Sequence, residues 1–199
     1  METTIGSIML QDNWDSDLVR QVVSGNSVAF DALFQRHKPF VYNVCYRMLG
    51  NADDAVDATQ STFIKAYDSI RKFRGDASFR TWLYRIAVNM CTEALRRESR
   101  RRGLLANTPD PAIDDDEPND GVWEAMLELN SDTRALLVLF YFQELSGSEV
   151  AQVMQCSEGA VRVRLHRARM LFKKKYEELG YELQAADENP AGVDFGRTQ

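Results

Sequence analysis

Apolar residues recur every three or four positions along most of this 199-residue chain, which is the pattern of amphipathic helices. Asp15 or Ser16 is placed to cap a short first helix, and Asn26 is placed to cap a longer second one. The second helix ends at Gly50, and Pro39 predicts that it is kinked or divided. The pattern favours an all-α fold.

The segment 51–70 predicts a third helix with two different faces. Its apolar stripe consists of Val56, Phe63, Tyr67 and Ile70. Its other face carries Asp53, Asp54, Asp57, Gln60 and Ser61. These acids lack the Glu-x-x-His pattern of di-iron bundles and have no histidine nearby, which argues against a metal site. The open alternatives are a solvated face and a docking face for a basic protein surface.

The stretch 70–102 combines aromatic, basic and amide side chains in one loop and one helix. The loop covers 72–77, and the helix runs from Ser78 to about Arg101, with an aromatic and aliphatic stripe and a basic end. Arginines can contact phosphates, aromatic rings can stack on bases, and amides can read base edges, so the mixture suits unpaired nucleic acid. A helix with a core-facing aromatic stripe and a solvated basic end explains the same composition.

The helical pattern stops after residue 102. Residues 103–120 contain three prolines and six acidic residues, which predicts an extended acidic linker between two domains. The pattern resumes at Gly121 with a short helix, and Ser131 is placed to cap a strongly apolar one. Residues 181–199 are expected to form a disordered acidic tail.

Between these helices and the tail, the sequence predicts a helix-turn-helix. Ser146 and Glu149 form a capping box, a tight turn covers 155–157, and a longer helix runs from Glu158 to about Leu179. Its inward residues are expected to be Val161, Leu165, Ala168 and Phe172. Those expected on the exposed side are Arg162, His166, Arg167 and Arg169. Such a helix enters the major groove of DNA by its first turn, although a solvated amphipathic helix fits the same pattern.

The overall charge limits how this chain can bind DNA. A net charge of −6 and a pI near 5.0 argue against binding by bulk attraction. Basic residues nevertheless gather at 96–102 and at 162–175, which indicates local DNA contacts that need a partner for affinity.

The remaining sequence features favour a cytoplasmic protein without catalytic chemistry. Cys45, Cys91 and Cys156 are too far apart for a zinc motif and indicate no disulfide framework, so they are expected to be buried apolar residues. His166 lacks a second metal ligand at helical spacing. No signal peptide, long apolar run, phosphate-binding glycine loop or nucleophile–base pattern is found, so neither membrane insertion, a catalytic residue nor a cofactor is expected.

Three segments together resemble a known family. They are DAVDATQSTFIKAY at 54–67, FRGDASFRTWLYRIAVNMCTEALRR at 73–97 and VAQVMQCSEGAVRVRLHRAR at 150–169. A single helix-turn-helix match is weak, but three blocks in this order are specific for the minimal two-domain bacterial sigma factors of the extracytoplasmic function (ECF) group in the sigma-70 family. The resemblance implies a four-helix sigma-2-like domain at 15–102, the linker, and a sigma-4-like domain at 121–180.

The resemblance also implies roles for individual residues. Docking to the clamp of the large β′ subunit of core RNA polymerase is assigned to Asp54, Asp57 and Gln60. Recognition and melting of the −10 element is assigned to Phe73, Arg74, Gly75, Asp76, Arg80, Trp82, Arg85 and Asn89. Recognition of the −35 element is assigned to Arg162, Val163, Arg164, His166 and Arg167. Further implied partners are the polymerase β flap, promoter DNA and an anti-sigma factor.

The leading interpretation is therefore a promoter-specificity subunit that binds core polymerase, recognises two promoter elements and helps to melt the downstream one. The main alternative is a conventional helix-turn-helix regulator that binds duplex operators without polymerase. An enzyme would require the carboxylates of the third helix to bind a metal ion. Trp82 keeps a second interpretation, as a core anchor of the first domain.

Overall fold

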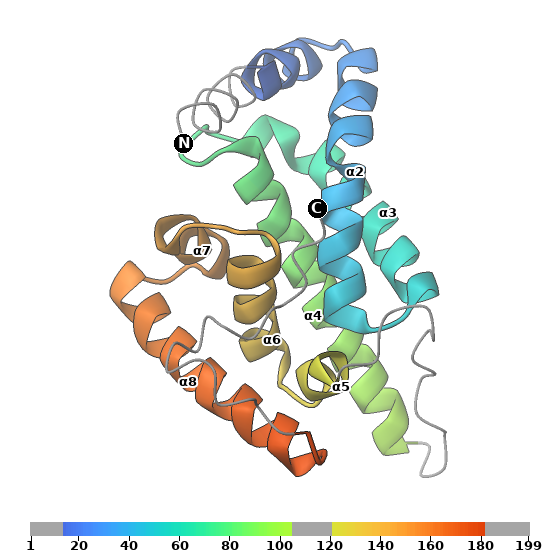
Figure 1. Ribbon diagram of the computed structural model, residues 1–199. Coiled ribbons are helices and arrows are strands. Elements are labelled where there is room, and N and C mark those ends of the chain that lie inside the picture. Colours follow the sequence, from blue (N-terminus) through green and yellow to red (C-terminus); the bar gives the residue numbers. More distant parts are fainter. Residues whose placement is uncertain (1–13, 105–120, 182–199) are drawn as a thin grey trace.

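The computed structural model describes residues 14–104 and 121–181, and all regular elements in these ranges are helical (Figure 1). The first unit contains a helix whose described part covers 14–23, then α2 (Val28–Leu49), α3 (Ala52–Ser69), the 3-10 turn η1 (Ile70–Lys72) and α4 (Phe79–Leu104). The second contains α5 (Val122–Leu127), α6 (Ser131–Leu137), the π-helix η2 (Val138–Phe142), α7 (Gly147–Met154) and α8 (Glu158–Glu178).

These elements confirm the predicted all-α class. Helix α4 includes the first two residues that were assigned to the linker, and the rest of the predicted linker and the predicted tail beyond Tyr181 lie outside the described residues. None of the helices in the described ranges is long and apolar enough to cross a membrane.

The first unit forms its core where α2, α3 and α4 meet. Leu33, Val41 and Met48 of α2 pack with Phe63 of α3 and Leu83 of α4, and all five are buried. Small residues on α3 bring the helices close together because they leave room between the backbones. Pro39 lies inside α2 without dividing it. Among the cysteines, the two in this core are buried, as predicted, and the third, in the second unit, is half-buried.

The predicted stripe of α3 was partly wrong. Phe63 and Ile70 are buried, but Val56 and Tyr67 are 43% and 48% exposed. The face that packs on α2 and α4 is instead formed by Ala55, Ala58, Thr59, Thr62, Phe63 and Ala66. The hydroxyls of both threonines donate to carbonyls one turn earlier, so these polar residues are satisfied inside the core. The acidic face is exposed, as predicted.

Several predicted caps were also wrong. Residue 14 is already helical, and the buried Asp15 side chain bonds to α2 instead of capping. The N-cap of α2 is Ser27, and Asn26 donates from its side chain to Gln21. The N-cap of α6 is Asn130, one residue before the predicted Ser131. These sites offer two or three capping residues in succession, so sequence alone does not select one.

The helix-turn-helix is present at the predicted positions. Ser146 and Glu149 form a reciprocal capping box at the start of α7. Gln155 adopts a left-handed conformation, with φ of 51°, and ends α7. Ser157 then caps α8, whose inward residues Val161, Leu165, Ala168 and Phe172 are all buried as predicted.

The second unit packs directly on the first. Helix α7 lies against α4, and η2 and α6 lie against α2 (Figure 1). The buried Arg134 of α6 is at the centre of this arrangement. Its guanidinium donates to the carbonyls of Met126, Leu127 and Leu129 at distances of 2.5 to 3.0 Å, and to that of Met48 at the end of α2 at 2.5 Å. Burial lowers the pKa of Arg134 to about 10, so the side chain remains charged at neutral pH.

We expect Arg134→Ala to lower the free energy of unfolding by about 3 kcal/mol, because it leaves four carbonyls without their charged donor. Urea unfolding followed by circular dichroism measures the change. Lys174→Ala, which removes an exposed partner of Glu178, is the control and should change stability by less than about 0.5 kcal/mol. A similar small change for both variants would contradict this assignment.

A second buried polar group fixes the N-terminal helix on α2. Asp15 accepts a hydrogen bond from Arg36 at 2.9 Å and contacts His37 Nε2 at 2.8 Å. Because an ionised carboxylate can only accept, His37 Nε2 is the donor, and within the described residues the buried Nδ1 has no partner. Burial raises the pKa of Asp15, but the hydrogen bonds and positive charges of His37 and Arg36 outweigh it and lower the pKa below 3.8.

We expect Asp15→Asn to lower the free energy of unfolding by about 2 kcal/mol at pH 7, because charged hydrogen bonds are lost in a buried site. The folded pKa of Asp15 is depressed, so its contribution is complete above 3.8 and disappears as the pH falls through the folded pKa. Urea titrations between pH 7 and pH 3 should therefore show that the difference in unfolding free energy between the parent protein and Asp15→Asn becomes smaller below pH 3.8. Asp17→Asn alters an exposed ion pair with Arg20, so its unfolding free energy should differ little from that of the parent protein at any pH.

Candidate nucleic-acid interface

The loop before α4 has a conformation that its sequence explains. Phe73 closes the η1 turn by donating its backbone N–H to Ile70 at 3.0 Å. Gly75 has φ of 77°, in the left-handed region that favours glycine. Ser78 then accepts a hydrogen bond from the backbone of Thr81 at 3.1 Å, which starts α4. The loop is thus held at both ends while its middle remains exposed.

Three aromatic rings connect this loop to the core. The ring centroids of Phe73 and Phe79 are 5.8 Å apart, and each lies within 5.6 Å of Trp82. Phe79 is buried, Trp82 is 8% exposed, and Phe73 is half-buried at the edge of the cluster. His37 packs edge-on against Phe79 from below, with the ring centroids 5.3 Å apart. Trp82 is therefore a core anchor as well as part of the loop's surroundings.

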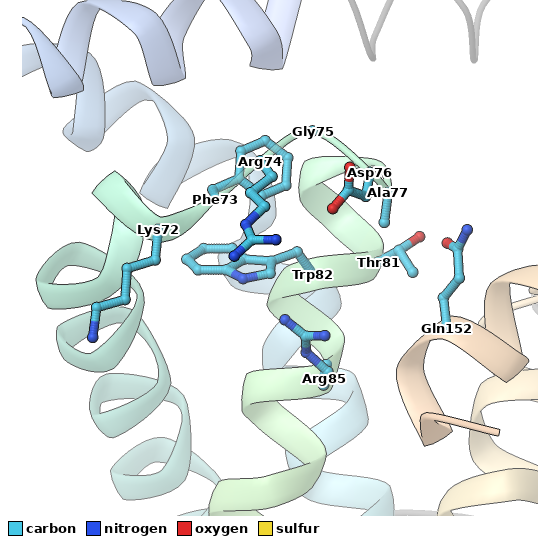
Figure 2. A pocket seen from close by; sticks show the side chains of 10 residues that line it. All are labelled: Lys72, Phe73, Arg74, Gly75, Asp76, Ala77, Thr81, Trp82, Arg85 and Gln152. Carbon is cyan, nitrogen blue, oxygen red and sulfur yellow. The ribbon is translucent and has the colours of Figure 1, made fainter.

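A cavity of about 350 Å³ opens between the loop and α4 (Figure 2). Its lining combines aromatic walls, guanidinium groups and polar loop residues: Lys72, Phe73, Arg74, Gly75, Asp76, Ala77, Thr81, Trp82, Arg85 and Gln152. Figure 2 shows Trp82 beneath the loop and Gln152 reaching toward this region from a different helix. A flat apolar wall next to hydrogen-bond donors is what a base requires when it leaves the stack.

The structure brings together most of the residues expected to read the −10 element, but not all. Arg80 is half-buried and faces the second unit, where it pairs with Glu149 at 3.5 Å. Asn89 is exposed further along α4 and does not line the cavity. Three further residues line the cavity but were not assigned to the −10 element: Ala77 and Thr81 lie inside the segment 73–97, and Lys72 directly precedes it. Gln152 was missed because no local signal in the sequence relates α7 to this loop.

The acidic face of α3 borders an apolar groove. Asp54, Asp57 and Gln60 are exposed on this helix. Gln60 also lines a groove of about 400 Å³, together with Phe30, Phe34, Phe63, Ile64, Tyr67 and Asp68. The exposed Tyr67 had been expected in the core, which is why the sequence did not indicate this groove.

Helix α8 presents its expected DNA-facing residues to solvent. Arg162, Val163, Arg164, His166 and Arg167 are all exposed. Arg169 was expected on the exposed side of the helix, but it is half-buried and donates to the Tyr141 hydroxyl at 2.5 Å. That contact fixes α8 on η2, so Arg169 has a structural role.

Comparison with known proteins gives matches over both units. Family models described as Sigma-70 region 2 and Sigma-70, region 4 match residues 33–101 and 120–172. RNA polymerase sigma-H factor of Pseudomonas aeruginosa is 35% identical, over 86% of this chain and 98% of the relative. The ECF RNA polymerase sigma factor SigW of Bacillus subtilis is 31% identical, over 81% of this chain and 96% of the relative.

Solved structures agree with these matches. CnrH, in complex with the cytosolic domain of CnrY, has a TM-score of 0.62 and 27% identity, over 83% of this chain and 98% of CnrH. The sigma factor RpoE of Bartonella quintana, in complex with the anti-sigma factor NepR, shares the fold, with a TM-score of 0.60 and 20% identity over 74% of this chain and 96% of RpoE. On its family matches and its identity to curated relatives, the chain belongs to the extracytoplasmic function group of the sigma-70 family of RNA polymerase sigma factors.

Proposed function

We propose that this protein directs core RNA polymerase to specific promoters, by recognising the −35 and −10 elements and melting the DNA at the latter. The observation that carries the proposal is the division of the surface into three parts on separate elements. An acidic face lies on α3, an aromatic and basic cavity lies at the start of α4, and a row of exposed basic residues lies on α8. The names of its relatives as RNA polymerase sigma factors support the same function.

The cavity at the loop is the proposed site for a base of the non-template strand. Phe73 and Trp82 supply stacking surfaces, while Arg74 and Arg85 supply positive charge and donors. Extracting a base costs a few kcal/mol, and stacking returns about 1–3 kcal/mol per base. Further along α4, the exposed Asn89 is suited to read a base edge at the upstream end of the same element.

The other two surfaces serve docking and duplex recognition in this proposal. Asp54, Asp57 and Gln60 of α3 dock on the clamp of the large β′ subunit, where a basic surface complements the carboxylates. Helix α8 enters the major groove of the −35 element, and Arg162 and Arg167 are exposed and long enough for bidentate contacts to guanine.

Further parts of the proposal follow from family membership. The protein acts in the cytoplasm as a binding subunit, and the catalytic chemistry belongs to the polymerase. The second unit also contacts the β flap. A regulatory protein partner of the anti-sigma type is supported by CnrH, which was solved with the cytosolic domain of CnrY. The same proposal divides the chain into a sigma-2-like domain at 15–102, a linker at 103–120, a sigma-4-like domain at 121–180 and a tail at 181–199.

Run-off transcription with purified core polymerase tests the function. A cognate promoter is first obtained by mapping transcript starts after overexpression. We expect the protein to start transcription there only together with core polymerase and to bind the promoter poorly alone, because its net charge is −6. Tight binding to a duplex operator with no initiation would instead support a conventional helix-turn-helix regulator.

A pair of variants tests the division of labour. Phe73→Ala should slow promoter opening at least roughly tenfold and leave core binding unchanged, because a stacking surface is removed. Asp57→Lys should weaken core binding roughly fivefold, through charge reversal at an interface. Opening is followed by 2-aminopurine fluorescence in the −10 element, and core binding by fluorescence anisotropy of labelled protein.

Two controls match these substitutions. Phe40→Ala removes an exposed phenylalanine outside the three surfaces, and Glu177→Lys reverses a charge near the end of α8. Both should behave like the unaltered protein. If Phe73→Ala lost core binding while opening stayed normal, the assignment of the surfaces would be wrong.

A further inference from the structure

We propose that Asp15 and His37 are positioning residues for promoter opening, because they hold the Phe79 ring, and through it the Phe73 ring, in the place where an unpaired base is received. This inference rests on the proposed function, since it concerns how the cavity at the loop is kept ready for a base. Asp15 is 2% and His37 5% exposed, and neither residue lines the cavity, so both act without touching DNA.

The loop that carries Phe73 has few contacts of its own. Its ends are held by the hydrogen bond from Phe73 to Ile70 and by the Ser78 cap of α4. Gly75 lies at its tip (Figure 2), and a Cβ there would meet no atom within 4 Å among the described residues beyond its chain neighbours. Exposed segments with few packed contacts open and move easily. The place of the Phe73 ring therefore depends on the rings beneath it.

Those rings form a series that leads from the cavity to a buried carboxylate. Phe73 packs edge-on against Phe79, with the ring centroids 5.8 Å apart and the planes at 87°. Phe79 packs in turn against His37, with the centroids 5.3 Å apart and the planes at 61°. His37 Nε2 lies 2.8 Å from Asp15 Oδ2. The N-terminal helix is thus connected to the wall of the cavity through side chains alone.

Asp15 gives this series a fixed end. One carboxylate oxygen accepts a hydrogen bond from Arg36 at 2.9 Å, and the other accepts from His37. Hydrogen bonds to a charged group are stronger than those between neutral groups, so they restrain the imidazole more firmly than packing alone. Rotation of the imidazole would also leave a buried carboxylate oxygen without its donor, which is costly. The orientation of the His37 ring is therefore well defined.

Histidine combines two properties at position 37. Its Nε2–H donates to Asp15, and its flat ring packs against Phe79. A phenylalanine would supply the ring without the donor, and a glutamine would supply the donor without the ring. The combination is costly, because within the described residues the buried Nδ1 has no hydrogen-bond partner. A residue that served packing alone would avoid this cost, so the unpaired nitrogen supports a directional role for the ring.

A ring that is already in place increases the fraction of molecules that can accept a base. When the stacking wall is mobile, ordering it on binding consumes part of the stacking free energy. Loss of Asp15 frees His37 and lowers the competent fraction, and apparent binding weakens by the same factor. The surfaces on α3 and α8 contribute no residue to the series, so docking on polymerase and −35 recognition should not change.

Two substitutions in the full-length protein interrupt the series at different points. Asp15→Ala removes the acceptor of His37, whereas His37→Gln keeps a donor for Asp15 and removes the ring that packs on Phe79. Both should slow promoter opening roughly threefold to tenfold in the 2-aminopurine assay. Core binding and −35 duplex binding should each change by less than about twofold. Circular dichroism sets a temperature at which the variants are folded, and His37→Gln carries the test alone if Asp15→Ala does not fold.

Val22→Ala is the matched control. It removes buried methyl groups from the same N-terminal helix and so lowers stability, but Val22 is not part of the series. We expect this variant to open the promoter at the rate of the parent protein.

A double-mutant cycle separates positioning from general destabilisation. When Asp15 acts through Phe73, Asp15→Ala has no ring left to position in a Phe73→Ala background. We therefore expect Asp15→Ala to slow opening by less than about twofold in that background, against roughly threefold to tenfold in the parent protein. A merely structural loss would slow opening by the same factor in both backgrounds.

Trp82 reports on the cluster without DNA, because it packs against both phenylalanine rings of the series. Protein labelled with 5-fluorotryptophan contains three labelled positions, and the single substitutions Trp14→Phe and Trp123→Phe assign the other two fluorine resonances. The Trp82 resonance should shift or broaden in Asp15→Ala and in His37→Gln, because the rings around it are released. It should stay unchanged in the control variant.

The outcomes separate the positioning role from the function on which it rests. Normal opening by either folded variant, equal slowing by Asp15→Ala with and without Phe73, or an unchanged Trp82 resonance would overturn the positioning role even if run-off transcription succeeds. Failure of run-off transcription would overturn the proposed function, whereas a displaced Trp82 resonance would still show that Asp15 and His37 hold the aromatic cluster.

Discussion

The packing of Phe79 at the start of α4 is the contact on which the arrangement of the site depends. Phe79 is buried between His37 below and the rings of Phe73 and Trp82 beside it. Burial of such a ring contributes about 2–3 kcal/mol and fixes the direction in which the loop leaves the core. The N-terminal helix joins the same point, because Asp15 holds His37. The exposed loop is therefore supported by a rigid base rather than by its own contacts.

Much of this fold was predictable because local signals and burial agree. In α8, the apolar spacing and the tight turn at 155–157 gave both the approximate limits and the inward face correctly. In α3 the apolar spacing and the burial disagree. Alanines and threonines form most of the packed face, while Val56 and Tyr67 are exposed. Hydrophobicity alone selects the larger residues, but close helix packing favours the small ones. The groove beside Gln60 was missed for the same reason.

Contacts between the units could not be predicted in this way. The pairs Arg80–Glu149 and Tyr84–Gln143 join residues far apart in the sequence, and no local pattern relates the two members of either pair. Glu149, for example, already serves the capping box of α7. A residue that satisfies one local rule gives no sign of a second partner. The sequence therefore indicated most of the lining of the −10 cavity from α4 and its loop, but not the contribution of Gln152 from α7.

Helix α4 serves both the core of the first unit and the proposed −10 site, and this limits which residues of the site can be substituted. Trp82 and Phe79 cannot be changed without loosening the core, whereas Phe73 and Arg74 at the exposed edge can change with less effect on folding. We therefore expect substitutions that alter promoter preference to lie at the edge of the cavity and along the exposed face of α4, while the core residues Phe79 and Trp82 stay unchanged. The same logic applies to α7, because a substitution at Glu149 acts at once on the helix cap and on the ion pair with Arg80 of α4. Substitutions that keep the cap and remove the charge are the ones that separate these roles.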